Sequence, residues 1–303
     1  MPELILHHYD LSPFGEKVRL AFGYKGLAWR SVEVPIWPPR PDTAPLTAGY
    51  RRSPVLQIGA DIYCDTLRIL REIDRRHPEP SLYPGLAAAL SWWADTTLFI
   101  PAARLTTSII GDAIPAEFLE DRIAFMKQDF SKAASLRDLP LNRQRAAAQM
   151  TLLADMLGDG RPFLLGNDFS AADLAAYHTL WFTRKNGGAA AEALLPFTPL
   201  HAWMERVASV GHGARSPMDP AEALAIARTA APEPAAGVPA DDPSGLKRGD
   251  RVTVHTDDAN DPIRGEFVGA DPHEIVIRHE NDQVGAVHVH FPRVGYSVIA
   301  EPC

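Results

Sequence analysis

The alternation of apolar and polar positions over the first 84 residues is typical of a small α/β domain. Two proline turns, at residues 77–80 and 83–85, close this segment. Within it the pattern predicts four strands and two helices in the order βαβ followed by ββα. The strands are Leu4–Tyr9, Trp29–Val34, Val55–Ile58 and Asp61–Cys64, and the helices are Gly15–Lys25 and Thr66–Arg76.

The middle of the chain, residues 85–227, shows a helical pattern. Apolar residues recur three and four positions apart, as in Leu119, Ile123, Met126 and Phe130. Ser170 followed by Asp173 is a capping-box variant, which predicts that a helix starts at Ala171. No strand pattern persists here, so we predict an all-helical domain.

The pattern changes again near the C-terminus. Residues 228–244 are rich in proline and alanine and predict a stiff, extended linker. Residues 245–303 show short alternating segments separated by polar turns, which favours a small, SH3-like β-barrel module. We expect this module to be structural and to dock on the helical domain. A module that binds another protein is the second interpretation. Its predicted strands are Arg251–His255, Gly265–Val268, Glu274–Arg278 and Ala286–Phe291.

Composition narrows the possible function classes. A hydrophobic fraction of 46% and a charged fraction of 22% indicate a folded globular protein. The formal net charge of -8 argues against a nucleic-acid partner. We expect no membrane span and no export signal, and only two cysteines are present. A cytoplasmic location is therefore expected, with any anionic ligand bound by residues 1–84, where basic residues slightly outnumber acidic ones.

A serine is placed to perform chemistry at the start of the first predicted helix. Ser12 directly follows the first strand, so its hydroxyl is expected at the helix N-terminus. Pro13 fits a first turn because its missing N–H loses no hydrogen bond there. An ordinary serine N-cap is the alternative interpretation.

Two further motifs lie at strand and helix boundaries. In the Ser53-Pro54-Val55 motif, a cis Ser53–Pro54 bond would expose the Val55 backbone to a peptide ligand, whereas a trans proline would simply open a strand. Asp65 and Thr66 begin the second helix, where they can cap it while its free N–H groups receive a carboxylate.

Taken together, these motifs resemble those of the cytosolic glutathione transferases, in the serine or cysteine branch. Val18-Arg19, Gly26-Leu27 and the stretch from Phe163 to Asp173 also match that family's patterns, and the resemblance covers about residues 3–210. It implies an α+β multidomain fold, with a thioredoxin-like domain at residues 1–84 and an all-helical domain at residues 85–227. The module at residues 245–303 lies outside it.

The resemblance also implies a function and a site. Glutathione would be the co-substrate, with Ser12 contacting its sulfur and stabilising the thiolate for attack on a hydrophobic electrophile. A non-catalytic scaffold, or a glutathione-dependent isomerase, dehalogenase or ether-cleaving enzyme, is the alternative. The implied glutathione contacts are Ser12, Phe14, Arg40, Arg52, Ser53, Pro54, Val55, Asp65 and Thr66, and the implied electrophile pocket contains Trp92, Trp93 and Arg104.

The resemblance further implies a homodimer. Arg68, Arg71, Arg75 and Arg76 on the second helix would face the acidic helical domain of a second subunit, although they fit a solvated face as well.

Some features depart from the family pattern or stay open. Gly15 stands where a resolving cysteine would be needed, so no dithiol chemistry is expected. The cationic contact for the glycyl carboxylate has no unambiguous match, since Arg40, Arg51 and Arg52 all qualify. Tyr9 offers a rival hydroxyl. His288 and His290 share one strand face, but we expect no metal, because a histidine ladder on a solvent-facing strand is the commoner arrangement.

Overall fold

The first α/β unit has the predicted order of elements. The computed structural model describes residues 2–126, 128–235 and 237–302. In this unit β1 pairs in parallel with β2 and antiparallel with β3, which continues antiparallel to β4. Its elements are β1 (Ile5–His8), α1 (Pro13–Tyr24), β2 (Ala28–Glu33), β3 (Val55–Ile58), β4 (Asp61–Cys64) and α2 (Thr66–Arg76).

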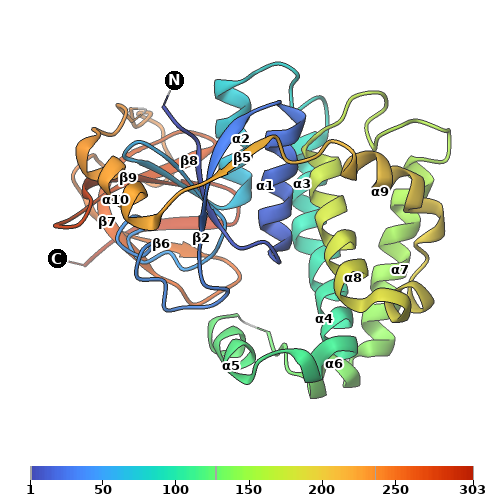
Figure 1. Cartoon of the computed structure of the whole chain (residues 1–303). Helices are drawn as coiled ribbons and strands as arrows, with labels where there is room; N and C mark the ends of the chain where they lie inside the picture. Colours follow the sequence, from blue (N-terminus) through green and yellow to red (C-terminus); the bar gives the residue numbers. More distant parts are fainter. Residues whose placement is uncertain (1, 127, 236, 303) are drawn as a thin grey trace.

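Helices form the second part of the molecule and pack beside α1 (Figure 1). The predicted capping box is confirmed: α8 begins at Ala171, and the Asp173 carboxylate accepts hydrogen bonds from the backbone N–H groups of Ser170 and Leu164. The α-helices are α3 (Ala87–Trp93), α4 (Phe99–Ile110), α5 (Ala116–Phe125), α6 (Lys132–Arg137), α7 (Leu139–Met156), α8 (Ala171–Leu194) and α9 (His201–Ala208). Shorter turns are π-helical at Ala94–Leu98 and 3-10 at Gly111–Ala113 and Thr198–Leu200.

After α9 the chain returns to the first sheet, which the sequence pattern does not predict. β5 (Ala214–Pro217) pairs in parallel with β2, and α10 (Pro220–Thr229) packs against the sheet. Buried Met218 and Ala223 contact Ile5 and Val32 of β1 and β2. The expectation that residues 85–227 hold no strand is therefore wrong. β5 is short and exposed, so backbone pairing rather than an alternating apolar pattern defines it.

The C-terminal module contains one more strand than predicted. Its strand order, β10-β6-β7-β8-β9, is that of an SH3-like meander whose last strand returns to the first. β10 begins at Tyr296, directly after the turn at residues 293–295. The strands are β6 (Arg251–Thr256), β7 (Ile263–Ala270), β8 (Glu274–Asn281), β9 (Gly285–Pro292) and β10 (Tyr296–Ala300).

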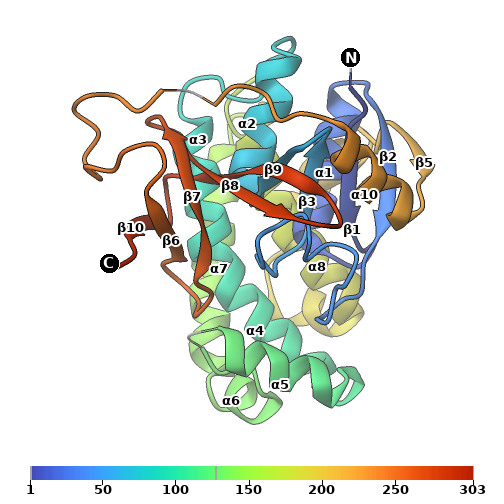
Figure 2. The same cartoon turned by 90° about the vertical axis from the view of Figure 1, so that its left-hand side faces the viewer.

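The module docks mainly on the thioredoxin-like sheet, and its contacts with the helical domain, where docking was expected, are smaller, such as the bridge between Ala259 and Met126. β9 pairs in parallel with β4, with Ile62 opposite Val289, and one ten-stranded sheet results (Figure 2). All four residues of β4 are buried. Because a buried edge strand must satisfy its backbone N–H and C=O groups, β4 needs a neighbouring strand, and β9 supplies it.

Two apolar clusters lie on opposite faces of this sheet. Leu56 and Ile58 of β3 point into the core shared with α1, α2 and the helical domain. Val55 points to the other face, where it packs with Phe267 and Phe291 of the module. Alternate residues of β3 therefore pack on opposite faces of the sheet, one face against the helical domain and the other against the module.

The linker after α10 has neither helix nor strand in its described part, yet it is fixed at Glu233 and at Asp242, which pairs with Arg293. The Glu233 carboxylate pairs with Arg75 and Arg76 of α2, and its backbone N–H donates to Asp61 at 2.8 Å. At Glu233 the linker therefore passes the C-terminal end of α2 and the start of β4.

Candidate functional site

Ser12 lies at the N-terminus of α1 with its hydroxyl buried. Its Oγ accepts the Gly15 N–H at 2.9 Å, and only 1% of the residue is exposed. A Cβ at Gly15 would come within 3.1 Å of the Ser12 Cβ, so this position has little room for a side chain. Because Oγ already accepts one hydrogen bond, its own proton is available to a second group. The arrangement suits stabilisation of an anion by a hydroxyl and a helix N-terminus.

A buried polar chain fastens α1 to the helical domain next to Ser12. Lys17 Nζ donates to Asp95 at 2.5 Å and to Thr66 Oγ1 at 3.2 Å, and Asp95 also pairs with His178 Nε2 at 2.9 Å. Burial lowers the pKa of His178, although the Asp95 carboxylate acts in the opposite direction. The Phe14 ring lies 4.7 Å from the His178 ring. The turn at Ser12 is therefore held against both α2 and α8.

The Ser53-Pro54-Val55 motif lies across the sheet from β1. The Ser53–Pro54 peptide bond is cis. Val55 opposes His7 in the β1–β3 pairing, and Ser53 Oγ donates to the His7 carbonyl at 3.4 Å. Pro54 thus lies at the strand's start, where its missing N–H interrupts no ladder.

Asp65 adopts a left-handed backbone conformation that residues other than glycine rarely take. Its φ is 70°, and its carboxylate accepts the Leu67 N–H at 2.9 Å as the N-cap of α2. Burial raises the pKa of Asp65, although the Leu67 N–H and the charges of Arg52 and Lys17 oppose this. Strained residues of this kind persist where the surrounding structure holds them, often at ligand clamps. Asp65 and Thr66 therefore form a rigid N-terminus on α2.

The three candidate arginines have different partners. Arg40 is buried and donates to the backbone carbonyls of Pro35, Ile36 and Arg51, so it organises its own loop. Arg51 pairs with Asp121 of α5. Arg52 pairs with Asp258, which lies between β6 and β7 of the module and whose side chain is 55% exposed.

The module brings further residues to this region that the sequence analysis misses. The Tyr296 hydroxyl donates to the Asp65 carboxylate at 3.0 Å, and Thr256 Oγ1 accepts from Arg52 at 3.1 Å. Tyr296 and Thr256 are direct partners in the β6–β10 pairing. No local motif marks Tyr296 or Thr256. They are close to Asp65 and Arg52 because the pairing of β9 with β4 places the module beside the first sheet.

The residues of the implied electrophile pocket have separate neighbours. Trp93 packs against the main core. Trp92 lies against the turn before β10, where a Cβ at Gly295 would come within 2.8 Å of its ring. Arg104 pairs with Asp138 at the start of α7. The three side chains therefore contact different parts of the molecule: Trp93 the helical core, Trp92 the module, and Arg104 the start of α7.

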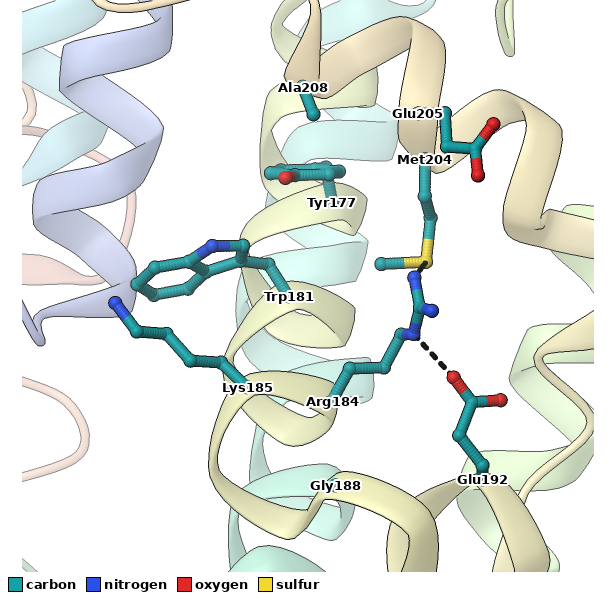
Figure 3. A pocket seen from close by; sticks show the side chains of 9 residues that line it. All are labelled: Tyr177, Trp181, Arg184, Lys185, Gly188, Glu192, Met204, Glu205 and Ala208. Atoms are coloured by element: carbon teal, nitrogen blue, oxygen red, sulfur yellow. Dashed lines mark hydrogen bonds and ion pairs between the residues drawn. The ribbon is translucent and has the colours of Figure 1, made fainter.

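A hollow of about 450 Å³ lies instead between α8 and α9. Figure 3 shows Arg184 directed toward Glu192 and the Met204 sulfur, with Trp181 on the other side. Lys185 Nζ lies 4.5 Å from the Trp181 ring centroid. The lining residues include none of the predicted glutathione contacts, so we assign this hollow no part in the site. They are Tyr177, Trp181, Arg184, Lys185, Gly188, Glu192, Met204, Glu205 and Ala208.

The two alternating histidines of β9 do not form the expected solvent-facing ladder. His290 is buried at the β4–β9 junction, where its ring nitrogens pair with Asp61 at 3.0 Å and Glu274 at 3.1 Å. Arg68 of α2 also pairs with Glu274, at 2.6 Å. Over residues 2–126, 128–235 and 237–302, no group of three or more ligating side chains is arranged to hold a metal ion. In the same described part of the chain, no helix is long and apolar enough to span a membrane.

The sheet with a serine at its first helix, followed by an all-helical domain, defines a thioredoxin-like fold of the glutathione-transferase type. Comparison with known families agrees. Residues 6–81 match the N-terminal domain of glutathione S-transferases, and residues 128–206 match their C-terminal domain. The chain belongs to the glutathione S-transferase superfamily.

Solved structures extend this comparison. A GST-like protein from Pseudomonas syringae is 38% identical, with a TM-score of 0.78, over 98% of this chain and 99% of that one. Its match therefore includes the C-terminal module. A glutathione S-transferase from Rhodospirillum rubrum F11 shares the fold at 21% identity and a TM-score of 0.52, over 68% of this chain and 87% of its own. Glutathione transferase F2 from Populus trichocarpa shares it at 13% identity and a TM-score of 0.52, covering 68% and 93%. No curated protein matches the chain.

Proposed function

We propose that this protein is a glutathione S-transferase-like enzyme in which Ser12 activates the thiol of glutathione for attack on a hydrophobic electrophile. The observation that carries the proposal is the buried Ser12 hydroxyl, which accepts the Gly15 N–H at 2.9 Å and keeps its own proton for a ligand. Membership of the superfamily supports glutathione as the co-substrate.

The free energies involved agree with this role. A thiol with a pKa of about 8.5 must lose roughly two units, or about 2.7 kcal/mol, to be mostly thiolate near pH 7. A hydroxyl that donates to the anion contributes about 1.5–3 kcal/mol. The N-terminus of a helix adds about 0.3–1 kcal/mol. Ser12 and α1 therefore suffice without a general base.

The remaining contacts follow from the same region. We propose that the Val55 backbone binds the cysteinyl amide and that Asp65 and Thr66 bind the γ-glutamyl end at the α2 N-terminus. Ser53, Pro54 and Phe14 shape the two turns that flank the thiol. Arg40, Arg51 and Arg52 stay our candidates for the glycyl carboxylate, and each already has partners in its own chain: loop carbonyls for Arg40, Asp121 for Arg51 and Asp258 for Arg52.

Two other function classes use the same fold. A scaffold protein would retain the helical and thioredoxin-like domains without the reaction, since fold does not imply chemistry. An isomerase, dehalogenase or ether-cleaving enzyme would use the same thiolate on a different substrate. Trp92, Trp93 and Arg104 remain our prediction for the electrophile side, although they do not share neighbours in this structure.

Glutathione binding and thiolate formation distinguish these classes. Retention on a glutathione matrix together with a thiolate absorbance band near pH 7 is expected for the enzyme. Retention without that band would favour the scaffold. A screen of electrophiles with glutathione, read by product analysis, would then separate conjugation from isomerisation, dehalogenation and ether cleavage.

We also propose a cytoplasmic homodimer with a role in detoxification. The surface first expected for the dimer needs revision, because Arg68 is buried against Glu274 of its own chain and β9 covers the edge of β4. Arg75 and Arg76 pair with Glu233. A two-fold contact through α2 would therefore have to use Arg71, whose guanidinium stacks on Tyr83.

A further inference from the structure

The carboxylate of Asp65 has hydrogen-bond partners in two distant parts of the chain. Its Oδ1 accepts the Leu67 N–H of α2 at 2.9 Å, and its Oδ2 accepts the Tyr296 hydroxyl at 3.0 Å, across 231 residues of sequence. An ionised carboxylate has about four acceptor positions, so these two bonds leave capacity for a ligand group. The C-terminal module therefore supplies a direct partner to a residue that we assign to the γ-glutamyl end of the site.

The position of Tyr296 is set by close packing around the start of β10. Gly295, directly before it, has a φ of 80°, and a Cβ there would come within 2.8 Å of the Trp92 ring of α3. The Tyr296 ring centroid lies 5.8 Å from that of Phe291, and Tyr296 pairs with Thr256 of β6. Only 9% of Tyr296 is exposed. Its hydroxyl is therefore held between the module core and the helical domain, at a fixed place beside Asp65.

The surroundings of Asp65 make its negative charge costly. Burial raises the pKa of Asp65, and the nearby Asp95 carboxylate adds to this effect. The charges of Arg52 and Lys17 act in the opposite direction. A hydroxyl that donates to a carboxylate favours the charged form as well. Tyr296 therefore helps to keep Asp65 in the form that attracts a cation.

The γ-glutamyl end of glutathione offers Asp65 a suitable cation. This end carries an ammonium and a carboxylate on one carbon atom, and the ammonium is the group that an ionised carboxylate attracts. A charge-assisted hydrogen bond of this kind is directional, so it requires the Asp65 side chain to keep one orientation. The bonds from Leu67 on α2 and Tyr296 on β10 hold both of its oxygens.

We propose that Tyr296 is a positioning residue that acts through Asp65 on the γ-glutamyl ammonium group. The module thereby completes this end of the site, and the site selects thiols that carry a free α-amino group. This inference rests on the proposed binding of glutathione.

The test compares glutathione with its deamino analogue, glutaryl-cysteinyl-glycine, by isothermal titration calorimetry of the full chain at pH 7. The native chain should prefer glutathione by about ten-fold or more, the contribution of a hydrogen bond between charged groups. Tyr296→Phe keeps the packed ring and removes only the hydroxyl, and it should lower this preference by about five-fold.

Two further variants show whether Tyr296 acts through Asp65. Asp65→Asn removes the charge, and asparagine tolerates the left-handed backbone, so the preference should fall at least as far as in Tyr296→Phe. Adding Tyr296→Phe to Asp65→Asn should cause no further fall, because the hydroxyl then has no carboxylate to act through. Tyr63→Phe is the matched control. It removes another buried hydroxyl, which pairs with Arg76 at the last residue of α2, and should leave the preference unchanged.

The ratio of the two affinities separates positioning from folding, since a purely structural effect would weaken both ligands alike. Equal weakening of both ligands in Tyr296→Phe, or an unchanged ratio, would overturn the inference while leaving glutathione binding intact. An unchanged ratio in Asp65→Asn would also overturn it, because Asp65 would then not bind the ammonium. Absence of binding of either ligand to the native chain and to all variants would instead refute the proposed function, and this inference with it.

Discussion

Substitution of Ser12 by alanine tests the proposed chemistry most directly. The change removes the hydroxyl proton that would donate to the glutathione sulfur, and it also removes the oxygen that accepts the Gly15 N–H at 2.9 Å. Two separate effects are therefore expected, one on the pKa of the bound thiol and one on the stability of α1.

The first effect follows from the strength of a hydrogen bond to an anion. A contribution of about 1.5–3 kcal/mol is lost, and each pKa unit corresponds to about 1.4 kcal/mol. The pKa of bound glutathione should therefore rise by about one to two units in Ser12→Ala. The second effect, loss of an N-cap, should lower the free energy of unfolding by about 1 kcal/mol.

The assay is an absorbance titration of the thiolate in the enzyme–glutathione complex, with thermal unfolding measured in parallel. Ser131→Ala is a matched control, because Ser131 caps α6 by accepting the Ala134 N–H at 3.2 Å, away from the site. It should destabilise the chain similarly without changing the titration. Ser12→Thr, which keeps a hydroxyl, should retain most of the native pKa.

One result would refute the reasoning. If Ser12→Ala binds glutathione and its thiol titrates at the same pH as in the native chain, Ser12 does not stabilise the thiolate. Tyr9 would then be the next residue to replace, since it offers the rival hydroxyl; its ring centroid lies 6.0 Å from Cζ of Arg40.

Three further predictions concern the assembly of the chain. Burial lowers the pKa of His290, but its hydrogen bonds to Asp61 and Glu274 outweigh burial, so the pKa is raised in the folded protein. The protonated His290 should therefore stabilise the fold fully below about pH 6.5, and this contribution to the free energy of unfolding should be lost as the pH rises through the pKa of His290 in the folded protein. Thermal unfolding of the native chain and His290→Gln should then differ most at acidic pH, and a difference that grows toward alkaline pH would contradict this. Limited proteolysis should cut first between residues 230 and 245, and early cutting near residue 84 would speak against the proposed boundaries. Light scattering should give about twice 33.1 kDa, falling toward the monomer mass in Arg71→Glu; a native mass near the monomer value would exclude the dimer.

The sequence alone determined the elements whose signals are local. The βαβ and ββα order of the first unit and the start of α8 at Ala171 agree with the structure. Strand alternation, helix periodicity and the Ser170–Asp173 capping box depend on residues a few positions apart, so they can be recognised without a fold. For the same reason the position of Ser12 at a helix N-terminus was predictable.

The tertiary structure alone decided where the module lies and which of its residues reach the site. β9 pairs with β4 across more than 200 residues of sequence, through backbone hydrogen bonds that any strand can form. No local pattern specifies which edge a strand will join, and a short strand such as β5 carries little pattern of its own. The contacts of Asp258 with Arg52 and of Tyr296 with Asp65 follow from that one pairing, because it sets the module's position on the sheet.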